Sequence, residues 1–141
     1  MRYVPTRLRP HDLLFAGDRR LWVTGWDGWL GVFDPSGAPV GRITVGEQAH
    51  HLAFDCNGLV WITQPTRRVA VVDAVSRVVR AEVSIAGMPH HLALAGRWMV
   101  IADHDRGMAL VFNSDTRQQV AEVPIAAGPH GPASAPSQGP E

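Results

Sequence analysis

Residues 52–85 read LAFDCNGLVWITQPTRRVAVVDAVSRVVRAEVSI, a run of four short apolar segments separated by residues that favour turns. The segments span 52–54, 59–63, 68–73 and 78–85. The middle two are rich in β-branched and aromatic residues, which favours buried strands. Asn57-Gly58 favours a tight hairpin turn because both residues tolerate positive φ. We therefore predict four short antiparallel strands in this stretch.

The same unit occurs three times, with a period of about 40 residues. Four histidines mark the period at spacings of 39, 40 and 40 residues, namely His11, His50, His90 and His130. The second strand of each unit aligns as Trp22-Val23-Thr24, Trp61-Ile62-Thr63 and Ile101-Ala102-Asp103. No helical period occurs in the chain, because its apolar residues come in short runs broken by Gly, Pro, Asp and Asn. Four antiparallel strands repeated at this period are typical of the blades of a β-propeller.

The predicted fold class is all-β, a β-propeller segment of three four-stranded antiparallel blades plus one extra N-terminal strand. The predicted boundaries are 1–10 for the outer strand of a preceding blade, 11–49 for blade 1, 50–89 for blade 2, 90–130 for blade 3 and 131–141 for a disordered tail. The first segment is taken as a strand because it resembles the segment before His130. The tail consists mainly of Pro, Gly, Ser and Ala, a composition that disfavours a packed core.

Three blades are fewer than the four to eight with which propellers usually close. An open stack exposes an apolar face at each end, and such faces are association sites. We therefore expect self-association, or further blades that complete a ring. A truncated fragment with no independent function is the third interpretation.

The repeat resembles a known family in the segments 58–63, 68–73 and 83–85, which precede Pro89-His90. These are similar to the YVTN-type propeller repeat, and the related NHL and streptogramin-lyase propellers share much of the pattern. The resemblance covers about residues 2–130. It implies a propeller fold, and it leaves the activity open because the family includes many proteins of unknown role. The resembled family is often exported.

Composition limits the classes of partner. The chain has 13 basic and 13 acidic residues, so no general electrostatic attraction to nucleic acid or to an anionic membrane is expected. No apolar run approaches the roughly 20 residues of a membrane-spanning helix, and no secretory signal is recognised at the start, which makes the cytoplasm the default location. Cys56 is the only cysteine, which excludes an internal disulfide and a thiolate cluster.

The periodic histidines are candidate metal ligands. Each begins the innermost strand of its blade, so His11, His50, His90 and His130 are expected at equivalent heights near the axis. Converging imidazoles can bind a transition metal or an anion, and a divalent transition metal is the only cofactor we consider. The alternative is that these side chains hydrogen-bond loop carbonyls between blades. Some propeller enzymes carry a metal on such histidine rings, and the resemblance to streptogramin-lyase-like propellers implies a histidine at the channel mouth.

The residues that directly follow two of these histidines are also histidines. His51 and His91 are expected on the opposite face of their strands, packed beside a neighbouring blade, because side chains alternate along a strand.

Two turns carry further candidates for a ligand or partner surface. Trp26 and Trp29 flank a two-residue turn, where two indoles either pair across the hairpin or stack on a ligand. His104 and Asp105 follow Asp103 in another turn, where carboxylates beside a histidine suit base catalysis but are also common turn residues.

These observations favour a binding or interaction scaffold that contacts a small molecule or a protein. The alternative is a propeller enzyme, lyase-like or metal-dependent, with a histidine-lined axial site. The fold alone does not choose between them.

Overall fold

The computed structural model describes residues 9–125, which form twelve β-strands and no helix. Each group of four consecutive strands pairs antiparallel in chain order, giving three sheets that we call blades 1, 2 and 3. Blade 1 contains β1 (Pro10–Phe15), β2 (Leu21–Gly25), β3 (Trp29–Phe33) and β4 (Pro39–Thr44). Blade 2 contains β5 (Leu52–Phe54), β6 (Leu59–Gln64), β7 (Arg68–Asp73) and β8 (Val79–Ser84). Blade 3 contains β9 (Pro89–Ala95), β10 (Trp98–Asp103), β11 (Met108–Asn113) and β12 (Gln119–Pro124).

The predicted fold class is confirmed, because each sheet has the four antiparallel strands of a propeller blade. The extra strand predicted before blade 1 falls almost entirely outside the described residues, as does the tail predicted for 131–141. Within residues 9–125, no helix is long and apolar enough to cross a membrane.

Blade 2 shows how the sequence specifies these strands, whose ends agree with the prediction to within one residue. Gly58 occupies the β5–β6 turn with φ +77°, a conformation that glycine adopts without strain. Asp55 closes the same turn, since its Oδ1 accepts hydrogen bonds from the backbone N–H of Asn57 at 2.7 Å and of Leu59 at 3.0 Å. Its Oδ2 accepts one from the indole N–H of Trp61 at 2.9 Å. The turn is therefore tied to the core of the blade.

The hydrophobic core lies between blades. One cluster joins blades 1 and 2, and its members include Trp22, Leu30, Val60, Ile62 and Val72. A second cluster joins blades 2 and 3, and its members include Trp61, Val71, Met99, Ile101 and Phe112. Each blade therefore depends on its neighbour to bury its apolar face, as in other repeat architectures.

The strand register corrects the alignment of the third repeat by one residue. In blades 1 and 3, Pro10 pairs with Gly25 and Pro89 pairs with Asp103, so Asp103 occupies the position of Gly25. The counterpart of Trp22 is therefore Val100, whereas the sequence alignment had matched it to Ile101. The alignment failed because blade 3 has no tryptophan at this position to mark the register.

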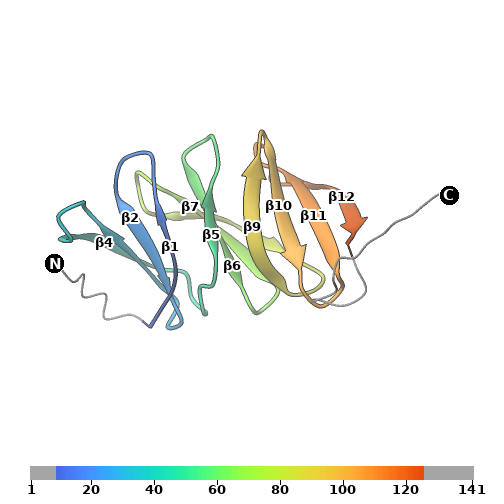
Figure 1. Cartoon of the computed structure of the whole chain (residues 1–141), viewed down its shortest axis with the longest axis horizontal. Helices are drawn as coiled ribbons and strands as arrows, with labels where there is room; N and C mark the ends of the chain where they lie inside the picture. Colours follow the sequence, from blue (N-terminus) through green and yellow to red (C-terminus); the bar gives the residue numbers. More distant parts are fainter. Residues whose placement is uncertain (1–8, 126–141) are drawn as a thin grey trace.

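The three blades lie side by side in chain order (Figure 1). Their first strands adjoin one another, since β1 contacts β5 and β5 contacts β9. The three blades thus spread like a fan, with β1, β5 and β9 as its inner strands. The residues at the beginnings of these strands therefore come together at one end of the structure.

Candidate functional site

The first strand of blade 3 begins with a β-bulge. His90 and His91 both lie opposite the single residue Ala102 of β10, because the register shifts there. Equivalent bulges lie at the start of blades 1 and 2. In blade 1, His11 and Asp12 lie opposite Thr24. In blade 2, His50 and His51 lie opposite Thr63. Bulges redirect side chains and are frequent beside functional sites.

Threonine hydroxyls support the bulges in two of the three blades. Oγ1 of Thr24 accepts a hydrogen bond from the Asp12 N–H at 3.0 Å and donates one to the carbonyl of His50 at 2.6 Å. Oγ1 of Thr63 accepts a hydrogen bond from the His51 N–H at 3.2 Å. Thr24 thus also connects blade 1 to blade 2, whereas blade 3 has an alanine at this position.

The bulges overturn the prediction that His51 and His91 point away from the periodic histidines. The imidazole ring of His51 lies 4.7 Å from that of His90, and the His91 ring lies 4.6 Å from the His90 ring. Strict alternation requires a regular strand, and the extra residue in each bulge cancels it. Both members of each pair therefore face the same end of the fan.

Six imidazoles from three blades form one group, which we call the imidazole cluster. Its members are His11, His50, His51, His90, His91 and His104. Ring centroids lie 4.9 Å apart for His11 and His50, 3.9 Å for His51 and His91, and 5.2 Å for His90 and His104. The cluster therefore runs without interruption across all three blades.

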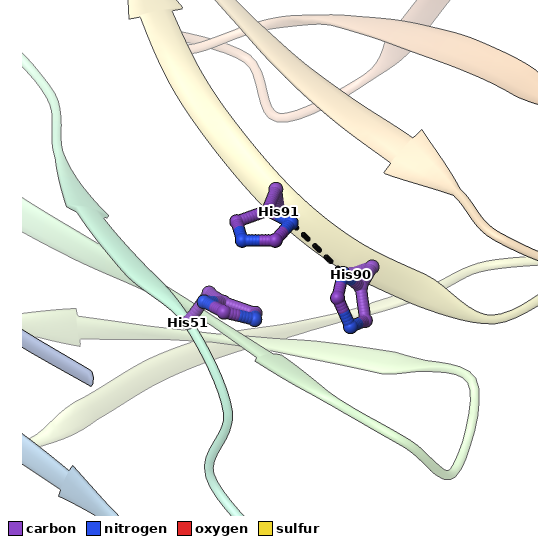
Figure 2. A group of neighbouring side chains, drawn as sticks. All are labelled: His51, His90 and His91. Atoms are coloured by element: carbon purple, nitrogen blue, oxygen red, sulfur yellow. Dashed lines mark hydrogen bonds between the residues drawn. The ribbon is translucent and has the colours of Figure 1, made fainter. Parts of the chain in front are cut away.

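Three members of the cluster are arranged as potential metal ligands. One ring nitrogen each from His51, His90 and His91 lies within 4.8 Å of the others. Figure 2 shows His51 on the segment leading into β5 and the other two side chains on β9, with all three rings around a common space. Nδ1 of His90 lies 2.9 Å from Nδ1 of His91 (Figure 2). The set thus bridges blades 2 and 3.

A carboxylate orients one of these imidazoles. Oδ2 of Asp12 lies 3.2 Å from Nδ1 of His51, and the His51 side chain is only 12% exposed. An imidazole that donates Nδ1–H to a carboxylate presents Nε2 as an acceptor or a metal ligand. Asp12 therefore selects the tautomer in which His51 can bind a cation.

His50 is the buried member of the cluster, at 8% exposure. Both of its ring nitrogens are buried, and neither has a hydrogen-bond partner among the described residues. Trp26 covers it, with ring centroids 4.6 Å apart in an edge-on arrangement. Buried polar atoms are normally paired, so an unpaired imidazole beside other imidazoles marks a place where a ligand can supply the missing contact.

The environment keeps several of these imidazoles neutral. Burial, followed by the neighbouring histidines, lowers the pKa of His90 to about 4. Burial also lowers the pKa of His50 and of His51, although the hydrogen bond that His51 donates to Asp12 opposes the change at His51. Neutral imidazoles are the form that binds metal ions.

The structure places the predicted periodic histidines as follows. His11, His50 and His90 come together in the cluster, and His130 lies outside the described residues. Of these, only His90 belongs to the three-nitrogen set. The sequence reasoning missed Asp12, although a carboxylate at the position of the second histidine in the other repeats was the available signal.

The predicted ligand or partner surface divides into separate environments. Trp26 contacts the imidazoles of His11 and His50, whereas Trp29 lies under the guanidinium of Arg42, 4.3 Å from its ring centroid. The indoles of Trp26 and Trp29 therefore contact different side chains. His104 occupies the turn position equivalent to Trp26 and contacts His90, and Asp105 beside it is exposed.

No family model and no curated protein sequence matches this chain. Solved structures do resemble it. The hydrazine synthase of Kuenenia stuttgartiensis matches 91% of this chain with a TM-score of 0.79 and 15% identity, over 39% of its own length. Dihydro-heme d1 dehydrogenase NirN in complex with DHE matches 88% with a TM-score of 0.76 and 14% identity, over 30% of its length. The WD40 repeats of RRP9 match 83% with a TM-score of 0.75 and 14% identity, over 39% of their length.

These likenesses define the class of protein by fold. The chain has the β-propeller fold, and it spans less than two fifths of the length of each of these structures. The resembling proteins include enzymes and repeat domains, so the fold leaves the activity to be argued from the site.

Proposed function

We propose that this chain is a propeller-type binding scaffold whose ligand is a late first-row transition-metal ion held by the imidazole cluster. The observation that carries the proposal is the set of three nitrogens from His51, His90 and His91 within 4.8 Å. Imidazole is a preferred ligand of Zn²⁺, Cu²⁺ and Ni²⁺, whereas Mg²⁺ and Ca²⁺ prefer oxygen.

The dimensions of the set suit such an ion after small side-chain rotations. Nitrogens bound to zinc at about 2.0–2.1 Å are about 3.3 Å apart in a tetrahedral site. The His90 and His91 nitrogens are already 2.9 Å apart. Closing the spread from 4.8 Å to about 3.3 Å requires a movement of up to about 1.5 Å, and Asp12 constrains the orientation of the His51 ring.

A metal ion would also relieve the electrostatic cost of the cluster. Packed imidazoles cannot all be protonated, since their mutual repulsion and burial lower the pKa of His50, His51 and His90. A single metal ion among the rings would supply the positive charge that several protons cannot. It would also bind the lone pairs of imidazole nitrogens that have few hydrogen-bond donors near them. The low pKa of His90, about 4, means that protons compete weakly for this ligand at neutral pH.

The ligand number favours catalysis as a second candidate function. Three protein ligands leave a coordination position for water, the arrangement of catalytic rather than structural zinc sites. His91 is exposed, so that position is open to solvent on the side of blade 3. A lyase-like or hydrolytic metal enzyme is therefore the alternative to a simple scaffold.

We also propose that the repeat is of the YVTN type. The support is the sequence pattern of blade 2, in which a glycine at the turn leads into two buried strands at 59–64 and 68–73. This finer assignment rests on the repeat and goes beyond the propeller fold itself.

The test measures Zn²⁺ bound by the purified chain, by metal analysis after dialysis and by calorimetric titration. We expect about one ion per chain, no binding of Mg²⁺, and at least about a tenfold loss of Zn²⁺ affinity in His91→Ala. His91 is exposed, so its removal leaves the core intact. Asp12→Asn should weaken binding by about 10- to 100-fold through the orientation of His51.

Cys56→Ser is the matched control, because the exposed thiol lies in the β5–β6 turn at the other end of β5 from His51. It should bind Zn²⁺ like the unsubstituted chain. Absence of stoichiometric binding, or equal affinity in His91→Ala, would contradict the proposal. Circular dichroism checks that each variant is folded.

A further inference from the structure

Each blade has two faces, and each junction packs one face of a blade on the opposite face of the next blade. We call the face that packs on the following blade the forward face, and the opposite one the backward face. At the junction of blades 1 and 2, Trp22 on the forward face contacts Phe54 on the backward face, with ring centroids 5.4 Å apart. At the next junction, Trp61 on the forward face contacts Phe112 on the third strand of the backward face, with ring centroids 6.1 Å apart.

The forward face of blade 3 has no such partner among the described residues. The residue that directly follows the outer strand is 7% exposed as Val45 in blade 1 and 4% exposed as Ile85 in blade 2, but 55% exposed as Ile125 in blade 3. The three positions are equivalent, because each donates its N–H to a carbonyl in the turn before the third strand. Blade 3 therefore exposes what blades 1 and 2 bury.

This face is also hollowed. A shallow groove of about 190 Å³ runs over it, lined mainly by small side chains, including Ala93, Val100, Ala102 and Ala109 together with Ile125. Val100 stands where blades 1 and 2 have tryptophan, so the absent indole leaves room for a larger partner side chain.

The backward face of blade 1 is open along its inner strand β1, whereas Val23 and Phe33 farther out on the same face are buried. Leu13 is 60% exposed, whereas its counterpart Leu52 in blade 2 is 6% exposed. Phe15 is 63% exposed, and its counterpart is Phe54, the residue that packs on Trp22. Large side chains therefore project from one end of the chain, and a groove lies at the other.

We propose that the forward face of blade 3 packs on the backward face of blade 1 of a second copy, so that two chains close a six-bladed ring. The contact repeats, at Leu13 and Phe15 of β1, the inner part of the junction that this chain already makes between its own blades. Propellers close with four to eight blades, and two copies of the three blades in residues 9–125 give six, a number in this range. Phe15 of each copy then enters the groove beside Val100 of the other, as Phe54 lies on Trp22.

The arrangement also extends the imidazole cluster. Within one chain, Asp12 in the bulge of blade 1 contacts His51 in the bulge of blade 2. The same step from blade 3 to the second copy brings the His11-Asp12 bulge of that copy next to His91. This interface stands on the exposed faces alone and is independent of metal binding.

The experiment measures mass in solution by light scattering and sedimentation. We expect the chain to run at twice its 15.3 kDa. Phe15→Glu and Ile125→Glu should each raise the dimer dissociation constant by about 100-fold or more, because each buries a charge at both junctions. Both side chains are exposed in the single chain, so the variants keep its fold.

Mixing the two variants tests the head-to-tail geometry. A mixed pair keeps one unaltered junction, so the mixture should regain a two-chain species that neither variant forms alone. Val75→Glu is the control, because Val75 is 89% exposed in the β7–β8 turn, and this variant should remain dimeric. A monomeric unsubstituted chain, sensitivity to only one of the two faces, or no recovery on mixing would overturn the proposal.

Discussion

At the residue scale, the histidines of this chain act as a group. Their rings lie close enough that protonation of one disfavours protonation of the next, and burial adds to the effect. His90 faces His51 and His50 from blade 2, His91 on its own strand and His104 from the turn after β10. The consequence is a pH-dependent stability that can be measured without any ligand.

We predict that the metal-free chain loses stability as the pH falls from about 6.5 to about 4. The pKa of His90 is about 4 in the folded chain against 6.5 in the unfolded chain, so the unfolded chain takes up the proton first. The stabilising contribution is therefore complete above pH 6.5 and is lost as the pH falls through this window. The lowered pKa values of His50 and His51 act in the same direction.

His90→Gln removes this proton site and should reduce the loss of unfolding free energy across the window by about 1 kcal/mol, a value kept small because solvent screens these partly exposed rings. The measurement is urea denaturation at several pH values with a chelator present. Cys56→Ser should keep the slope of the unsubstituted chain. An unchanged slope in His90→Gln would contradict the prediction.

At the element scale, the bulge at the start of each inner strand determines the site. A buried threonine opposite the bulge satisfies the backbone N–H of Asp12 in blade 1 and of His51 in blade 2. In blade 1 the same hydroxyl also donates to the carbonyl of His50. The bulge and the junction between blades 1 and 2 are therefore held by one side chain, Thr24.

We predict that Thr24→Val lowers the free energy of unfolding by about 1–3 kcal/mol, because it keeps the shape of the side chain but leaves buried backbone groups unpaired. Thr63→Val is the matched comparison and should cost less, since its hydroxyl makes one such hydrogen bond. Urea denaturation with an unchanged m-value measures both. Equal losses in the two variants would show that the bond to the His50 carbonyl contributes nothing.

Strand positions could be predicted from sequence because each apolar run is bounded by residues with strong turn preferences, such as Asn57-Gly58. The bulges could not be predicted from sequence. Two consecutive histidines are compatible with a regular strand, and only the pairing with the opposite strand shows that both histidines face a single residue. The one-residue error at Ile101 has a related cause, because only the pairing of Pro89 with Asp103 reveals the register.

At the scale of the whole molecule, stability is distributed along a line of blades. The two core clusters are the two junctions, and blade 2 contributes to both. In a linear array, an end repeat loses only one junction when it opens, whereas the middle repeat loses two. Blade 2 should therefore be the last part of a single chain to open.

We predict that, in the Phe15→Glu chain, the slowest amide hydrogen exchange occurs in β6 and β7, and that blades 1 and 3 exchange at least about tenfold faster through partial opening. The β12 strand should exchange fastest among the outer strands, because every one of its residues is exposed. Hydrogen exchange followed by mass spectrometry resolves the blades. In a closed two-chain ring, blades 1 and 3 would each gain a second junction, and their exchange rates would come close to that of blade 2. Equal protection of all three blades in the single Phe15→Glu chain would contradict the linear description.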